Sequence, residues 1–197
     1  MTRARGALGV ITPIHIAMNA NPTSDELHRL QKVREYRIMD TAPEAVFDEL
    51  VELAAHIAAT PIATLTFIDE NRQWFKSCIG LPMRQTARSI AFCDYTIRAH
   101  DPLLIPDIRL DSRFANNPLV VGDPHLRFYA GFPLIAADGT VIGTLTVMDV
   151  VARELSQEQI AKVQLIARQA MAHLEARLLA HREQALQAEM EKSQAEI

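Results

Sequence analysis

The spacing of apolar side chains predicts two helices in the first third of the chain. Apolar residues recur at near-helical intervals after a turn-rich stretch, which predicts a helix over 24–36. A second helix is expected to open at 41–44, with Pro43 in its first turn, and to end before Pro61. Its apolar residues fall on one face, so this helix should pack on a core.

From residue 62 the pattern changes to one that is typical of β-strands. β-Branched and aromatic residues gather in four runs, and short turn signals predict that neighbouring runs pair as hairpins. The segment 80–124 reads as mostly irregular, with a short helix at 92–99 and a short strand at 103–106. So long an irregular stretch inside a compact domain is typical of a functional region. The longer strands are expected at 62–68, 72–78, 127–135 and 140–148.

The last part of the chain reads as one long helix. Ser156 is a helix-capping residue, with Gln159 three positions later, and no stop signal follows. About 40 residues at 1.5 Å each would reach about 60 Å, more than one small domain covers. An apolar stripe at alternating three- and four-residue spacing predicts a parallel dimeric coiled coil. The alternative is a helix that packs on its own domain up to about Leu178. The residues expected at the dimer seam are Ala167, Met171, Leu174, Leu178 and Ala185.

Composition narrows the classes of function. The chain has 197 residues, 49% of them apolar, which suits one globular domain with appendages. The net charge is −4 and the basic residues are scattered, so nucleic acid is not expected as a direct partner. Cys78 and Cys93 form no CxxC pair, and the seven histidines stand singly. No metal site is therefore expected, and the cysteine usage indicates a reducing, cytoplasmic setting.

The N-terminal segment resembles a signal peptide at first sight, because Arg3 and Arg5 precede a mostly apolar stretch at 7–18. Pro13 interrupts that stretch, which is also far shorter than the roughly 20 residues of a membrane span. Residues 1–22 are therefore expected to form a poorly ordered leader, and no membrane association is expected.

Short motifs in a fixed order run through the chain. They include Pro43-Glu44-x2-Phe47-Asp48, Arg72-Gln73-Trp74-Phe75-Lys76-Ser77, Asp111-x-Arg113-Phe114, Asn117-Pro118-Leu119-Val120 and Arg127-Phe128-Tyr129-Ala130-Gly131. In this order they resemble the GAF domains at the N-terminus of bacterial sensor histidine kinases and diguanylate cyclases. The resemblance implies an α+β fold: a twisted antiparallel sheet of about six strands, helices on one face and a loop-roofed pocket on the other. It also implies a domain at 23–175 and a signalling helix at 176–197 that leads to an output domain outside this chain.

Strand alternation supplies the first candidates for the pocket. Successive side chains of a strand point to opposite faces of the sheet, so each of two strands has one apolar face and one face with threonines. The threonines that should face the pocket are Thr64, Thr66, Thr144 and Thr146. By the same rule Val141 belongs to the apolar, helix-covered face and Ile142 to the threonine face. Hydroxyls could bond a polar ligand, although threonine is also simply a good strand residue.

Cys93 begins the short helix that is expected over the pocket. A cysteine at a helix N-terminus can have a lowered pKa, which would suit a redox or chromophore-attachment thiol. The alternative is a small buried apolar residue. Polar residues of the long loop and the next strand complete the candidate pocket, although aspartate also builds turns. These residues are Tyr95, Asp107, Asp111, Arg127 and Tyr129.

The function implied by the resemblance is that of a sensor and not of an enzyme. A small molecule, which the residues do not identify, would bias the packing of sheet and helices. A homodimer would then pass the change through its terminal helices to an output domain such as a diguanylate cyclase or a histidine kinase. One alternative is a structural dimerisation module without a ligand. Another is a thiol enzyme of the free methionine sulfoxide reductase type, which shares the GAF fold and needs a nucleophilic cysteine with a resolving partner.

Overall fold

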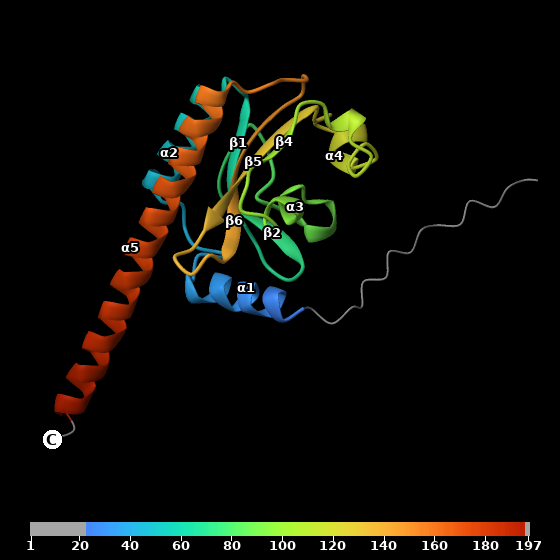
Figure 1. The fold of residues 1–197 in the computed structure, drawn as a ribbon. Helices are drawn as coiled ribbons and strands as arrows, with labels where there is room; N and C mark the ends of the chain where they lie inside the picture. Colours follow the sequence, from blue (N-terminus) through green and yellow to red (C-terminus); the bar gives the residue numbers. More distant parts are fainter. Residues whose placement is uncertain (1–22, 196–197) are drawn as a thin grey trace, which may run out of the picture.

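The protein is built around one antiparallel six-stranded sheet, seen here in a computed structural model that describes residues 23–195 (Figure 1). The strand order is β3-β2-β1-β6-β5-β4, so the first and last long strands pair at the centre of the sheet. The leader expected over 1–22 lies outside the described residues. The strands are β1 (Ile62–Ile68), β2 (Arg72–Ile79), β3 (Gln85–Ala87), β4 (Leu103–Ile105), β5 (Phe128–Ile135) and β6 (Val141–Asp149).

Helices cover both faces of this sheet, but in different ways. The long helices α2 and α5 cover one face, whereas the short helices α3 and α4 belong to the excursion over the other face, and α1 lies across one end (Figure 1). This arrangement gives the α+β fold that the motifs imply. The helices are α1 (Ser24–Glu35), α2 (Ala45–Ala58), α3 (Cys93–Thr96), α4 (Pro118–Val121) and α5 (Gln157–Ala195), with 3₁₀ turns η1 (Arg88–Ile90) and η2 (Ile108–Leu110).

Two apolar clusters lie on the two faces of the sheet. The larger one joins Leu65 and Leu145 of the central strands to Phe47 of α2 and Leu174 of α5, all of them buried. The smaller one joins the threonine face to the irregular segment, and Tyr129 is fully buried at its centre. Because both faces are covered, β1 and β6 are buried along their whole lengths.

Local signals explain most element boundaries, and three of the expectations need correction. Helix α2 begins at Ala45 and not at 41–44, because Glu44 has extended backbone angles and serves as the N-cap. β3 lies within the segment that reads as irregular. The register of β5 and β6 shifts between Leu134 and Ile135, which leaves Ile142 as an extra residue. Ile142 therefore packs in the larger cluster and Val141 in the smaller one, opposite to simple alternation.

Helix α5 starts on the domain and then leaves it. Ser156 and Gln159 form a reciprocal capping box. The backbone N–H of Gln159 donates to Ser156 Oγ at 3.2 Å, and the backbone N–H of Ser156 donates to Gln159 Oε1 at 2.9 Å. The helix is buried on one side as far as Leu178, after which it projects from the domain (Figure 1). Over 23–195, none of the helices has the length and apolar character to cross a membrane.

Candidate functional site

A small enclosed cavity lies between the threonine face of the sheet and the segments that cover it. Its free volume is about 20 Å³, enough for about one water molecule. No lining side chain is Lys, Arg, Asp or Glu, so the cavity is apolar with a few neutral polar groups. The lining residues are Gln73, Phe75, Leu81, Met83, Thr86, Ala91, Phe92, Cys93, Leu119, Pro124, Leu126, Tyr129 and Met148.

Two polar atoms of this cavity lack a hydrogen-bond partner among the described residues. They are Gln73 Oε1 and Thr86 Oγ1, on directly opposed residues of β2 and β3. Gln73 is 6% exposed as a whole, and its side-chain carbonyl oxygen has no access to bulk water. A buried polar group without a partner costs about 1–3 kcal/mol, and in native proteins it usually has a bound partner to explain it. These two atoms mark the place where a ligand or an ordered water could bind.

Cys93 and Tyr129 lie on the floor of the cavity and belong to a buried hydrogen-bond network. The Tyr129 hydroxyl lies 3.5 Å from Cys93 Sγ and 2.7 Å from Thr96 Oγ1, and Thr66 Oγ1 lies 3.6 Å from the same sulfur. Burial raises the pKa of the Cys93 thiol, and these hydrogen bonds lower it less than burial raises it. Of the two interpretations of Cys93, the structure therefore favours the small buried residue over a thiol whose pKa is lowered by the helix N-terminus, since burial outweighs the helix end.

The four threonines lie on the cavity-side face of the sheet but do not line the cavity. They pair across the two central strands: Thr64 Oγ1 lies 2.6 Å from Thr146 Oγ1, and Thr66 Oγ1 lies 2.8 Å from Thr144 Oγ1. All four are fully buried. Their hydroxyls already satisfy one another, so the structure gives them a role in sheet pairing.

The remaining candidate residues lie outside the cavity. Asp107 caps η2 and forms a bidentate ion pair with Arg127, whose hydrogen bond lowers the pKa of Asp107 to about 2. Asp111 accepts hydrogen bonds from the backbone and side chain of Arg113. Tyr95 is 38% exposed and packs edge-on against a phenylalanine ring. These contacts build the loop, as aspartate-rich turns often do.

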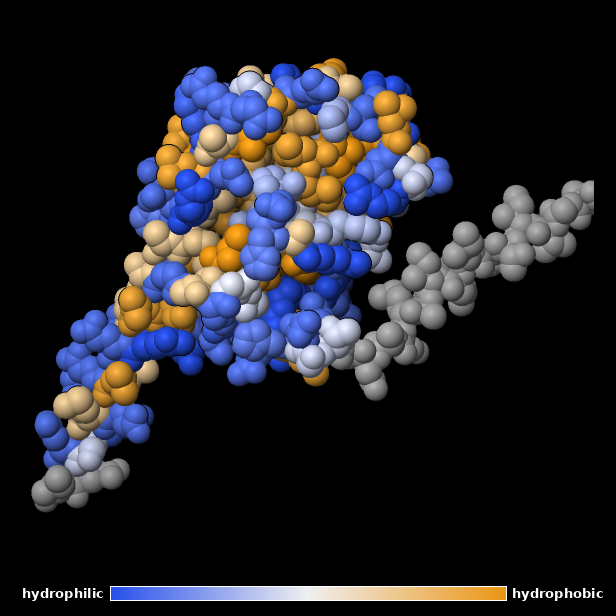
Figure 2. All heavy atoms as spheres, viewed as in Figure 1, coloured by the Kyte–Doolittle hydropathy of each residue, from blue (hydrophilic) through white to orange (hydrophobic). Residues whose placement is uncertain are grey.

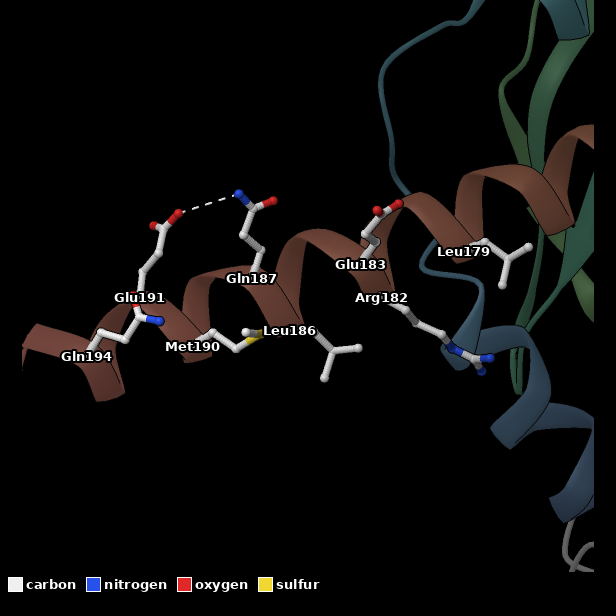
Figure 3. Close-up of a pocket in the computed structure, with 8 residues that line it drawn as sticks. All are labelled: Leu179, Arg182, Glu183, Leu186, Gln187, Met190, Glu191 and Gln194. Atoms are coloured by element: carbon white, nitrogen blue, oxygen red, sulfur yellow. Dashed lines mark hydrogen bonds between the residues drawn. The ribbon is translucent and has the colours of Figure 1, made fainter.

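The residues expected at the dimer seam mostly face their own domain. Four of them are buried in the larger cluster against the sheet and α2, namely Ala167, Met171, Leu174 and Leu178. Ala185 is exposed on the projecting part of α5. A different set of α5 side chains is exposed, and Figure 3 shows Leu179, Leu186 and Met190 along the projecting helix.

Sequence reasoning missed Gln73 and Thr86. Strand alternation places Gln73 and Phe75 on the same face of β2. Their direct partners in β1, Ile68 and Thr66, show that this is the face toward the cavity. The alternation along β2 can be seen in the sequence. The burial of Gln73 cannot, because the loops that cover it have no periodic pattern of apolar residues. Among residues 23–195, no group of three His, Cys, Asp or Glu side chains is placed to hold a metal ion.

An antiparallel six-stranded sheet with long helices on one face and a loop-covered cavity on the other defines a sensory-domain architecture of the GAF type. The GAF domain family model matches residues 42–174, which is more than half of the chain. The chain therefore belongs to the GAF domain family.

Known relatives agree with this assignment. A cyclic di-GMP phosphodiesterase of Pseudomonas aeruginosa is 38% identical over 151 residues, which cover 76% of this chain and 26% of that protein. The chain thus spans about a quarter of the curated relative it matches. A domain of a sensor histidine kinase from Sinorhizobium meliloti has a TM-score of 0.59 at 17% identity and covers 74% of this chain and 99% of its own. The PixJ GAF domain of Thermosynechococcus elongatus has a TM-score of 0.57 at 16% identity, with coverage of 84% and 95%.

Proposed function

We propose that this chain is the sensory domain of a cytoplasmic bacterial signalling protein, and that it binds a small neutral molecule in the cavity beneath α3. The observation that carries the proposal is the pair of unpartnered atoms, Gln73 Oε1 and Thr86 Oγ1, in an otherwise apolar cavity. An acceptor oxygen and a hydroxyl side by side suit a ligand with an N–H or O–H group on an apolar body. The uncharged lining disfavours phosphorylated ligands, which need cationic or amide-rich sites.

A ligand larger than water must widen the cavity, and the lining supports such a change. Met83 and Leu81 come from the loop between β2 and β3, and Leu119 comes from α4. Methionine adapts its shape at little cost, so the roof of the cavity can repack around a guest. The closed form would then be the unliganded state, and ligand would favour a wider one.

The strands β5 and β6 offer a path from the cavity to α5. Tyr129 and Met148 are direct partners that line the cavity, and the next pair, Ala130 and Val147, lies in the larger cluster on the opposite face. A ligand that pushes on the first pair would move the second, and β5 packs against α5. The domain at 23–175 would thereby act on the helix at 176–197 and on an output domain that follows it.

The relatives support an enzymatic output domain that is separate from this chain. The matched region is only 26% of a protein named a cyclic di-GMP phosphodiesterase, so the rest of such a protein has room for the catalytic machinery. A diguanylate cyclase or a histidine kinase would fit the same arrangement. Within this chain, the raised pKa and burial of Cys93 argue against the thiol-enzyme alternative, since the thiolate is the nucleophile.

Native mass spectrometry of the protein purified from a bacterial host tests the proposal. We expect a reproducible extra mass on the wild-type chain that is lost in Gln73→Met, because methionine removes the acceptor and fills the site. Gln187→Met, an exposed change on α5, is the matched control and should keep the extra mass. If the wild-type protein carries no extra mass and Gln73→Met gives the same result, the ligand-free dimerisation module is favoured. The small volume of the cavity also suits that module.

A further inference from the structure

The outer face of α5 carries a second apolar stripe that points away from its own domain. Leu165, Ala172, Leu179 and Leu186 follow one another at intervals of seven residues, and Met190 joins them at the end. The exposed fractions are 49% for Leu165, 61% for Leu179, 62% for Leu186 and 64% for Met190. At 100° per residue this stripe lies roughly opposite Val163, Ala170 and Leu174, which are buried in the domain. Figure 2 shows apolar side chains on the projecting end of α5.

A seven-residue repeat of exposed apolar residues, here three leucines and Ala172, is the pattern of a helix that pairs with another helix. The second core position of each heptad holds Gln169, Ala176, Glu183 and Met190. The positions that flank the core on one side hold Arg168, Glu175, Arg182 and Glu189, so their charges alternate in sign along the helix. This alternation is the feature that decides between the two directions in which two copies can pair.

We propose that α5 pairs with α5 of a second copy in the antiparallel direction, with Ala176 of each helix against Leu179 of the other near the two-fold axis. In this register Arg168 faces Glu189 of the other copy and Glu175 faces Arg182, and the symmetry forms each ion pair twice. In an antiparallel pair, the flanking positions on this side of one helix meet the flanking positions on the same side of the other helix. Because their charges alternate in sign, each positive residue then meets a negative one. The inference rests on the surface of α5 and does not require that the cavity binds a ligand.

Side-chain size also favours this register. Each small residue meets a large one, since Ala172 faces Glu183 and Ala176 faces Leu179 across the pair. A parallel pair would place Glu183 against Glu183, a like-charge contact, and would leave a gap where Ala172 and Ala176 meet their own copies. Its flanking charges would also lack partners, because Glu175 would face Ala180 and Arg182 would face Gln187.

Part of the charge pattern is already engaged within one chain. Glu175 accepts a hydrogen bond from the Tyr36 hydroxyl, and Arg182 approaches Glu35 at 3.9 Å. Arg168 and Glu189 are exposed and enter none of the hydrogen bonds or ion pairs found over 23–195. They are therefore the pair on which the proposal is tested.

The proposed register has a consequence for the output domains. Ala195 at the end of α5 in one copy would lie beside Ile160, near the start of α5 in the other, so the segments that follow the two helices would leave at opposite ends of the helix pair. A helix of 39 residues is about 60 Å long, and the two output domains would be held apart by about that distance.

Charge reversal provides the first test, with dimer dissociation measured by sedimentation equilibrium. We expect Glu189→Lys and Arg168→Glu each to raise the dissociation constant about 3–10-fold, and the double variant to restore it, because its charges are complementary again. The control Glu191→Lys, an exposed change on α5 outside the seam, should have little effect. In a parallel pair the two residues lie about 30 Å apart, so a double variant without rescue would overturn the proposal.

Cysteine cross-linking provides the second test and reports direction alone. In the proposed register residue 169 meets residue 186 of the other copy, so Gln169→Cys with Leu186→Cys should form a covalent dimer under mild oxidation, and neither single variant should do so. Wild-type protein controls for Cys78 and Cys93. Cross-linking of either single variant would show a parallel pair, and a monomer at all concentrations would also overturn the proposal. Either result would leave the ligand question, decided by native mass spectrometry, untouched.

Discussion

Thr64 of β1 and Thr146 of β6 are joined through their side chains, with the two hydroxyl oxygens 2.6 Å apart in a layer that no solvent reaches. The next pair along the same strands repeats the contact. Each hydroxyl needs a partner once it is buried, and the neighbour across the strand supplies it. The paired threonines therefore stabilise the register of the two central strands.

This pairing predicts an unequal response to single and double substitution. Thr64→Val should lower the free energy of unfolding by about 1–2 kcal/mol, because it leaves the Thr146 hydroxyl buried without its partner. Thr64→Val with Thr146→Val should cost much less than the sum of the two single changes, since valine matches threonine in shape. Urea unfolding of the three variants measures this difference. Equal, additive losses would instead mean that each hydroxyl has its own partner.

Much of the fold can be predicted from the sequence because its signals are local. Alternation along β1 places the threonines together, and the capping residues locate the start of α5. The bulge at Ile142 was not predictable in this way, because a register shift depends on the partner strand and not on the strand itself. As a result Val141 and Ile142 exchange faces.

The candidate site was harder to predict, for a related physical reason. The polar atoms of Gln73 and Thr86 are buried only because the loops around Met83 and Leu119 close over them. Loops have no periodic pattern of apolar residues from which such a closure could be predicted. On α5 two apolar stripes follow similar spacings, and the stripe that the sequence assigns to a dimer seam is the one that packs on the domain. The positions of α2 and β5 decide that the stripe with Leu174 is the internal one.

The two stripes of α5 predict different costs for two leucine changes. Leu174 is 1% exposed, so Leu174→Ala should lower the free energy of unfolding by about 2–5 kcal/mol. Leu179 is 61% exposed, so Leu179→Ala should change the stability of the monomer by less than about 0.5 kcal/mol. Thermal or urea unfolding at low protein concentration compares them without a contribution from self-association. A large loss for Leu179→Ala under these conditions would place that residue in the domain core.

The environment of Cys93 predicts slow thiol chemistry. Cys93 is only 3% exposed, whereas Cys78 is partly buried, and burial raises the pKa of both thiols. In the folded protein at pH 8, an alkylating reagent should therefore modify Cys78 first, and Cys93 should react only as the protein opens. Mass spectrometry of peptides over time measures the two rates, and denatured protein provides the control in which both react. Rapid labelling of Cys93 would revive the redox interpretation.

Two glycines, one in β6 and one in the turn between β5 and β6, predict a further contrast. A Cβ atom on Gly143 would lie 2.2 Å from the backbone oxygen of Thr66, which has little room to move in a central strand. Gly143→Ala should therefore lower the free energy of unfolding by about 3 kcal/mol or more. Gly139 has a positive φ of 86° but no neighbour within 4 Å of such an atom, so Gly139→Ala should cost only about 1 kcal/mol. The order of the two midpoints in urea checks this prediction.

An ion network between α1 and the segment over the cavity predicts a dependence of stability on pH. Arg88 donates to Glu26 of α1 at 2.6 Å and to Asp94 of α3 at 2.7 Å. Burial raises the pKa of Glu26, but the hydrogen bonds from Arg29 and Arg88 together outweigh it and lower the pKa to about 2. Because the folded pKa is below the usual value of 4.5, Glu26 stabilises the fold above pH 4.5, and this contribution is lost as the pH falls toward 2.

Glu26→Gln tests this network directly. At pH 7 we expect it to lower the free energy of unfolding by about 1–2 kcal/mol, a value reduced by the partial exposure of the carboxylate. The difference between the variant and the wild type should shrink as the pH is lowered from 5 to about 2, since protonation removes the same charge from the wild type. Glu52→Gln, an exposed change on α2, serves as the control and should be nearly neutral at pH 7. A difference for Glu26→Gln that stays constant across this range would mean that the side chain acts through packing and not through its charge.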